Sequence, residues 1–274
     1  MKNQCPICNS ENTKIRDREI GVYECLKCTH VFTVITGNPL TPYTEEYYNN
    51  KHKNWFEHPD VRLFRKIVKQ LDLENNQGKS LIDVGCGKGD FLKYVKNTGL
   101  KIQLYGIDPT KNVYDGIYFI QGDFMNIDFP DRKDFVVSTM VVEHVTEPNL
   151  FMRKIVDILK PNGVLVLNTI NSGALIHYLA RFLKIFGVRV VFDRLYDHHH
   201  LQHYTKKSLS QLVIQNGFEI TSHTIHNFPL KAVDLPENRA IIRQIYLAGV
   251  AIIFAFSNVF GGGLSQTIVC RKHT

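Results

Sequence analysis

The chain has 274 residues, of which 44% are hydrophobic and 22% are charged, as in an ordinary globular protein. This composition excludes a disordered chain, a collagen-like repeat and a protein made of many membrane spans. The 33 lysines and arginines exceed the 26 aspartates and glutamates, which gives a formal net charge of +7. Such a charge suits nucleotide, phospholipid or nucleic-acid partners, and equally an ordinary basic surface.

The first residues show no basic stretch followed by an apolar run, so no secretory signal is expected and the protein is predicted to be cytoplasmic. Four of the six cysteines form two Cys-x-x-Cys pairs near the N-terminus: Cys5, Cys8, Cys25 and Cys28. Two such turns joined by a hairpin place four thiolates around one tetrahedral ion. Residues 1–36 are therefore predicted to be a zinc ribbon, whose closed ligand shell makes the zinc structural rather than catalytic. Cys86 and Cys270 are expected to be small buried side chains.

Residues 37–77 are predicted to be an aromatic-rich connector followed by a helix. The connector either packs as a strap on the next domain or covers a pocket as a lid, and its aromatic side chains are Tyr43, Tyr47, Tyr48, Trp55 and Phe56. The helix is expected to begin at Pro59, with apolar positions at helical spacing: Val61, Phe64, Ile67, Val68 and Leu71. The second domain is taken to cover residues 78–274.

From Lys79 onward, short apolar strands alternate with amphipathic helices, a pattern typical of a parallel sheet covered on both faces. The strand 80–84 enters the glycine turn 85–89, and a helix follows directly. The next strand ends at Asp108, about twenty residues beyond the glycines, where a carboxylate can accept hydrogen bonds from both hydroxyls of a ribose. A third strand, 118–121, precedes an aspartate and a phenylalanine that could meet an adenine base.

The spacing of the glycines selects among nucleotide cofactors. They form a G-x-G-x-G pattern preceded by Asp83, and not the G-x-G-x-x-G pattern that seats a dinucleotide pyrophosphate. A phosphate-binding P-loop is also excluded, because the only Gly-Lys-Ser sequence, residues 78–80, precedes the strand. Asp83, Asp108 and Asp123, at the ends of three successive strands, therefore predict one nucleoside site.

Several motifs together resemble class I S-adenosylmethionine methyltransferases, in particular the ubiquinone-biosynthesis O-methyltransferases and methyltransferases of surface-polysaccharide pathways. These motifs are Leu81–Gly89, Gly106–Asp108, Gly122–Phe124, Glu143–Val145 and Leu159–Gly163. The resemblance covers about residues 60 to 225. It implies a Rossmann-like α/β fold with a doubly wound, mostly parallel sheet of seven strands, and S-adenosylmethionine as the cofactor.

The resemblance also implies which residues bind the cofactor. The glycine turn would hold the methionine part, Asp108 the ribose, and Asp123 with Phe124 the adenine. Arg62 or Arg65 would reach the methionine carboxylate. The complete predicted set is Arg62, Asp83, Gly85, Cys86, Gly87, Asp108, Asp123, Phe124 and Thr139.

Candidate catalytic residues follow the strand 135–139, at the edge where open parallel sheets bind ligands. Glu143 or His144 could act as the base for an acceptor hydroxyl, or the pair could only orient the following loop. His200 and His203 are predicted to line the acceptor pocket, with metal ligation and surface or capping roles as alternatives. Relatives in the ubiquinone pathway carry a metal-binding glutamate where this chain has Met140, so a metal-assisted reaction is not expected.

Two apolar segments leave a membrane contact open. In the predicted helix 174–186, one face carries the apolar residues Leu175, Leu179, Phe182, Leu183 and Phe186. The opposite face carries His177, Arg181 and Lys184, and packing of the apolar face on the core is favoured over binding to anionic lipid. Residues 245–264 lack charge and are long enough to span a membrane. Because residues 266–270 read as a strand returning to the sheet, a helix that covers the pocket, forms a homodimer or touches a bilayer is preferred.

The sequence therefore predicts O-methylation of a sugar, a lipid-linked compound or another small molecule, in a surface-glycan or related pathway. The four-cysteine ribbon, the pair Tyr47-Tyr48 and the segment 200–205 resemble bacterial methyltransferases of such pathways. Methylation of RNA is the alternative, although the motif Asn/Asp-Pro-Pro-Tyr and a cysteine nucleophile, which two classes of base methyltransferase use, are both missing. A third interpretation is a catalytically inactive protein that only binds the cofactor or a partner.

Overall fold

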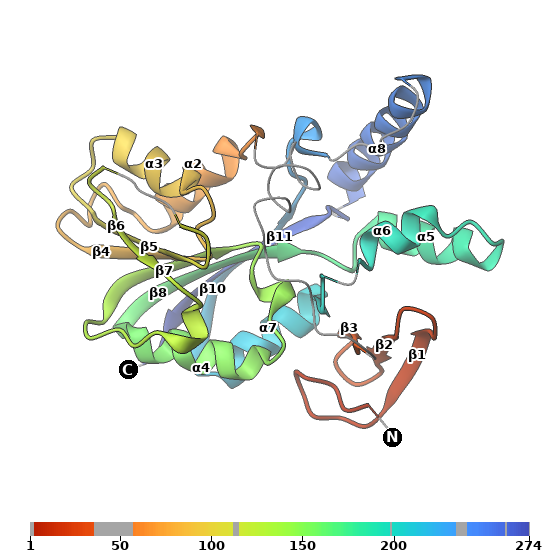
Figure 1. Ribbon diagram of the computed structural model, residues 1–274, viewed down its shortest axis with the longest axis horizontal. Coiled ribbons are helices and arrows are strands. Elements are labelled where there is room, and N and C mark those ends of the chain that lie inside the picture. The colour runs from red at the N-terminus through yellow and green to blue at the C-terminus, as the bar shows by residue number, and fades with distance from the viewer. Residues whose placement is uncertain are drawn as a thin grey trace.

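The computed structural model describes residues 3–35, 57–111, 115–197, 199–233, 240–260 and 262–273. A seven-stranded sheet with the strand order β10-β11-β8-β7-β4-β5-β6 crosses the centre of the molecule (Figure 1). Its parallel strands are β4 (Ser80–Val84), β5 (Gln103–Asp108), β6 (Tyr118–Gln121), β7 (Lys133–Thr139) and β8 (Leu159–Ile170). The strand β11 (Ser265–Lys272) runs antiparallel to β8, and β10 (Phe218–His226) runs antiparallel to β11. The predicted mostly parallel seven-stranded α/β fold is confirmed.

Helices cover both faces of this sheet. The helices α2 (Val61–Gln70) and α3 (Asp90–Asn97) lie on one face, and α4 (Pro148–Ile158) and α7 (Lys206–Gln215) lie on the other (Figure 1). Successive side chains of a strand point to opposite faces, so β4 contributes Leu81 to the core under α2 and α3, and Ile82 to the core under α4 and α7. The sheet is therefore buried on both sides, which explains its continuous apolar strands.

The helix α2 begins two residues later than the start predicted at Pro59. The Asp60 carboxylate accepts hydrogen bonds from the backbone of Arg62 and Leu63, and so caps the N-terminus of a helix that begins at Val61. Val61 is exposed, and the buried face instead includes Leu63 beside the expected Phe64.

The N-terminal ribbon forms a small sheet that a distant segment completes. The strands β1 (Thr13–Asp17), β2 (Val22–Cys25) and β3 (Val31–Thr33) are antiparallel neighbours, as the predicted hairpin requires. A fourth strand, β9 (Gln202–His203), pairs with β3. The side chains of His30 and Gln202 lie 2.9 Å apart, and those of Thr33 and His203 lie 3.1 Å apart. The sheet of the ribbon is thus shared between its own residues and the loop before α7.

The helix α5 (Leu175–Ile185) faces the opposite way from the prediction. Phe182 and Phe186 of the predicted apolar face are 57% and 69% exposed, whereas His177 is fully buried. The expectation that the apolar face packs on the core is wrong, because polar contacts hold the other face. Lys184 forms an ion pair with the buried Asp17 of the ribbon, and the His177 ring lies 3.3 Å from the Tyr196 hydroxyl, at the end of α6 (Val190–Leu195).

The long helix α8 (Ala240–Phe260) follows β10 and precedes β11 in the chain, as expected. Its Phe254 ring packs edge-on against Phe228, with 5.5 Å between the ring centroids. A search of the described residues found no helix with the length and apolar character that a membrane crossing needs. The aromatic side chains predicted for the connector, from Tyr43 to Phe56, lie outside the described residues.

Burial of His177 makes the stability of the fold depend on pH. Burial, together with the nearby Arg181 charge, lowers the pKa of this histidine to about 3. A histidine in the unfolded chain has a pKa near 6.5, so the unfolded state binds more protons below that pH. The free energy of unfolding should therefore fall as pH drops from about 6.5, by about 2 kcal/mol at pH 5 from this residue alone.

The variant His177→Gln removes the titrating group and keeps a polar side chain beside Tyr196. Guanidinium unfolding at pH 7.5 and pH 5 should show a smaller loss of stability on acidification for this variant than for the wild-type protein. Equal losses in the two proteins would contradict the assignment.

Candidate functional site

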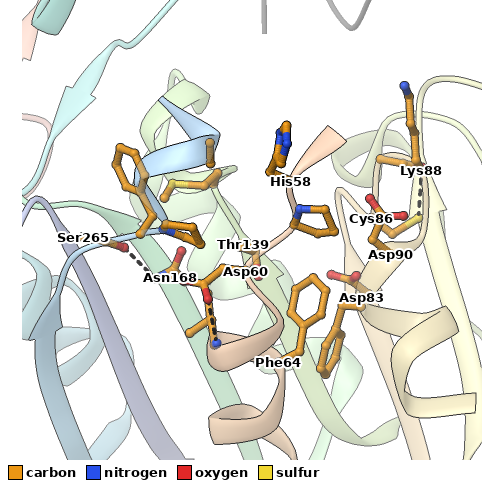
Figure 2. Close-up of a pocket in the computed structure, with 18 of the residues that line it drawn as sticks. His58, Asp60, Phe64, Asp83, Cys86, Lys88, Asp90, Thr139, Asn168 and Ser265 are labelled. Atoms are coloured by element: carbon orange, nitrogen blue, oxygen red, sulfur yellow. Dashed lines mark hydrogen bonds between the residues drawn. The ribbon is translucent and has the colours of Figure 1, made fainter. Parts of the chain in front are cut away.

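A pocket opens where β4, β7 and β8 reach their carboxyl ends (Figure 2). The start of α2 bounds it on one side, and the residues after β10 bound it on another. Five of the predicted cofactor residues line it: Asp83, Gly85, Cys86, Gly87 and Thr139. Sequence reasoning missed other lining residues, among them His58, Asp60, Phe64, Asn168, His226, Phe228 and Ser265. The pocket lies at the edge of the sheet at which the sequence placed a ligand.

The glycine turn after β4 needs its glycines. Gly85 has a φ of +73°, and a Cβ atom there would lie 2.3 Å from a methyl group of Val141. The backbone N–H of Gly87 donates a hydrogen bond to Asp108 over 2.9 Å, which ties the turn to the end of β5. At the glycine positions of the turn, the backbone itself therefore faces the pocket.

Asp83 places a buried carboxyl group in the pocket. Its side chain is 4% exposed and lies beside Phe64 in Figure 2. Its Oδ1 has no hydrogen-bond partner among the described residues. Burial, together with the negative charges of Asp108 and Asp90, raises the pKa of Asp83 to about 8. A bound cation would pair this carboxylate, so the site fits a ligand that carries a positive charge.

The other predicted cofactor residues do not line this pocket. Both carboxylate oxygens of Asp108 accept hydrogen bonds, from the backbone of Gly87 and from Thr110. Asp123 accepts a bond from the backbone of Met125 and caps the short helix η2 (Phe124–Asn126). Phe124 is buried in the core under α4, and Arg62 is exposed. The ribose and adenine assignments stay predictions.

The candidate catalytic residues lie beyond the pocket, on and near the short helix η3 (Val142–His144). Glu143 is 1% exposed, and the Thr169 hydroxyl donates to its Oε2 over 2.8 Å. Burial raises the pKa of Glu143 to about 7. The rings of His144 and His200 lie 4.9 Å apart, whereas His203 is buried at the contact with the ribbon. The structure thus brings His144 and His200 together and gives His203 a contact with Thr33.

The four N-terminal cysteines form a cluster. All four sulfur atoms lie within 4.8 Å of one another, with 3.5 Å between Cys5 and Cys28 and 3.5 Å between Cys8 and Cys25. Four thiolates bound to one zinc ion at about 2.3 Å would lie about 3.8 Å apart, so the donor set fits zinc. A hydrogen bond with Cys28 lowers the pKa of Cys5, which favours the Cys5 thiolate. Cys86 and Cys270 are buried, as expected.

Comparison with known proteins places this geometry in a family. A family model described as a methyltransferase domain matches residues 55–223. A ubiquinone biosynthesis O-methyltransferase from Bradyrhizobium diazoefficiens is 27% identical over 176 residues, which cover 60% of this chain and 66% of the relative. The match thus spans just under two thirds of that relative.

Solved structures share the fold at low sequence identity. Phosphoethanolamine N-methyltransferase 2 from Haemonchus contortus, in complex with S-adenosyl-L-methionine, superimposes with a TM-score of 0.58 at 14% identity, over 84% of this chain and 58% of that one. The cyclase SpnF superimposes with a TM-score of 0.54 at 20% identity, over 78% and 81% of the two chains. The shared fold therefore occurs with more than one kind of chemistry.

The cysteine cluster generates a test of metal binding. We expect purified protein to contain about one zinc per chain, and Cys5→Ser to release it and lower the melting temperature, because metal held only by the folded ribbon stabilises that fold. Cys270→Ala is the matched control, since Cys270 is equally buried but lies outside the cluster. It should retain the zinc. Metal analysis that finds no zinc in the wild-type protein would contradict the predicted ribbon.

Proposed function

Because the chain belongs to the methyltransferase domain family that matches residues 55–223, we propose that it transfers a methyl group from S-adenosylmethionine to a hydroxyl group of a small molecule. The observation that carries this proposal is the buried, unpaired Asp83 carboxyl beside a glycine turn. S-adenosylmethionine carries an ammonium and a sulfonium, so the cofactor supplies the positive charge that this site lacks. The match to an O-methyltransferase supports oxygen as the accepting atom.

In this proposal, different residues bind different parts of the cofactor. Asp83 and the turn from Gly85 to Gly87 hold its methionine end, with Thr139 at the neighbouring strand end. Asp108 accepts bonds from the ribose, and Asp123 and Phe124 contact the adenine. Arg62, which is exposed beside Asp60, would have to turn toward the pocket to reach the carboxylate. When bound, the cofactor supplies an electrophilic methyl group.

The protein contributes mainly alignment and exclusion of water, because methyl transfer to oxygen is an in-line displacement. A base is needed to take the proton of the acceptor hydroxyl, and we assign this role to Glu143 or His144. Glu143, with a pKa of about 7, can change protonation near neutral pH. His144 lies beside His200, which we place with the residues that meet the acceptor.

The pocket and its surroundings support an acceptor with an apolar part, such as a lipid-linked sugar. Phe228, Pro229 and Ala232 form an apolar wall, and Phe228 packs on α8. The outer sides of α5 and α8 expose further apolar residues: Leu175, Leu179, Phe182, Ile185, Phe186, Ile252, Phe256 and Val259. We propose that this surface touches a membrane from the cytoplasmic side, and a homodimer contact is the alternative use of it.

RNA is a less suitable acceptor on these grounds. RNA phosphates would need basic residues of the ribbon such as Arg16, and Arg16 forms an ion pair with Glu24 of the neighbouring strand. Methyl transfer from radiolabelled cofactor to sugar nucleotides, lipid-linked sugars, catechols and RNA tests the choice. We expect incorporation into one of the hydroxyl compounds. Incorporation into RNA alone, falling steeply with salt, would overturn the proposal.

The proposed role of Asp83 predicts that cofactor binding depends on pH. With a pKa of about 8 in the free protein, Asp83 is mostly protonated at pH 7, and a bound ammonium or sulfonium favours its ionised form. Binding should therefore release a proton, and affinity should rise between pH 6 and pH 8.5. Calorimetry in two buffers of different ionisation enthalpy measures the released proton.

The variant Asp83→Asn should release fewer protons and bind S-adenosylmethionine at least tenfold more weakly, a loss of about 1.4 kcal/mol. NAD, which the glycine spacing excludes, serves as the control ligand and should not bind. Unchanged affinity in this variant would remove Asp83 from the site.

A further inference from the structure

The wall of the pocket opposite Asp83 carries uncharged hydrogen-bonding groups that the cofactor assignment does not use. Asn168 and Ser265 both line the pocket and are both 1% exposed. They come from the paired strands β8 and β11, and Figure 2 shows them joined by a hydrogen bond. A buried strand such as β8 usually carries apolar side chains. A buried asparagine there is costly unless its polar atoms form hydrogen bonds.

The hydrogen bonds of Asn168 fix which way its amide points. Its Nδ2 lies 3.1 Å from the backbone carbonyl of Gln266, which can only accept, so the NH2 group faces β11. The same nitrogen lies 3.0 Å from the Ser265 hydroxyl and 2.9 Å from the Thr267 hydroxyl, so its two hydrogens are shared among three acceptors. The Oδ1 atom on the other side has no partner among the described residues. A buried amide oxygen without a donor is costly, which makes it a site for a ligand donor.

Ser265 supplies the complementary group. Its Oγ accepts the hydrogen bond from Asn168, and among the described residues no acceptor is found for its own O–H. The two side chains thus offer the pocket one acceptor, the Asn168 Oδ1, and one donor, the Ser265 hydroxyl. An alcohol hydroxyl donates one hydrogen bond and accepts others, so it matches both groups at once.

Thr267 and His226 hold this arrangement in place. The Thr267 Oγ1 accepts from Asn168 and shares a second hydrogen bond, over 2.8 Å, with the His226 Nε2. Burial lowers the pKa of His226, whose charged neighbours on and before α2 are Asp60, Arg62 and Lys66, and this keeps the ring neutral. Both are positioning residues, because they act on the ligand through Asn168.

We propose that Asn168 and Ser265 form the subsite that recognises the acceptor, and that they select a neutral hydroxyl group over a carboxylate or phosphate. An ionised group has no hydrogen to donate to Oδ1, and the carboxylates of Asp60 and Asp90 in the same pocket add repulsion. The inference rests on the proposed transfer to a hydroxyl and names the class of compound at that site.

The test compares matched neutral and anionic compounds. The neutral probes are catechol and a methyl hexoside, and their anionic counterparts are 3,4-dihydroxybenzoate and the corresponding methyl hexuronide. Binding of each is measured by calorimetry in the presence of S-adenosylhomocysteine, and methyl transfer by label incorporation. At least one neutral probe should bind at least tenfold more tightly than its anionic counterpart.

The variant Ser265→Ala removes the hydroxyl, which is the donor to the ligand and one acceptor of the Asn168 amide, and it changes the shape of the pocket little. It should raise the Kd and KM for the neutral probe at least fivefold, and leave the affinity for S-adenosylhomocysteine within twofold. Asn168→Ala should have a larger effect. Ser138→Ala is the matched control, because Ser138 is equally buried on the adjacent strand β7 but does not line the pocket. It should leave all these values unchanged.

The outcomes separate this inference from the proposed function. Failure of the cofactor to bind, or methyl transfer to none of the probes, overturns the proposed transferase. The subsite is retained if the neutral probe still binds to the wild-type protein and this binding is lost in Ser265→Ala. Methyl transfer that ignores Ser265→Ala and Asn168→Ala overturns the subsite alone. Equal binding of neutral and anionic probes, or binding of neither, also overturns it.

Discussion

The parallel pairing of β4, β7 and β8 is the constraint on which the rest of the structure depends. Asp83 lies opposite Val137, and Thr139 lies opposite Asn168, so three strands end at one level of the sheet. The polar residues at these ends thereby share one pocket, although long helices separate them in the chain. Burial under helices on both faces leaves this edge as the place where the sheet can meet a ligand.

Much of the fold was readable because it is local. Short-range periodicity and turn chemistry predict the strand 80–84, the glycine turn and the helix after it. The spacing of the cysteine pairs predicts that the four cysteines cluster. The subsite of Asn168 and Ser265 was not readable, because it depends on the pairing of strands 97 residues apart. An asparagine inside the apolar run of β8 was the available signal. For α5, periodicity revealed an amphipathic helix but not which face is buried, because the ion pair of Lys184 with Asp17 decides that.

The fold alone does not determine the reaction. A cyclase and an N-methyltransferase both superimpose on most of this chain, so the chemistry resides in the side chains that each protein adds at the end of its strands. In this chain the pocket has the buried Asp83 on one wall and the amide and hydroxyl groups of Asn168 and Ser265 on the other. Under our proposal, a ligand is oriented because the two walls bind different chemical groups.

The pairing of β9 with β3 affects how the ribbon folds during synthesis of the chain. Thr33 of the ribbon meets His203 across a separation of 170 residues, so the ribbon leaves the ribosome long before the residues that complete its sheet. A small sheet with an open edge is marginal on its own and prone to pair with the wrong strand. The four cysteines precede β9 in the chain and therefore emerge before it. Capture of an ion at that moment would hold the hairpin in register during synthesis. The cluster would then act during folding as well as in the finished structure.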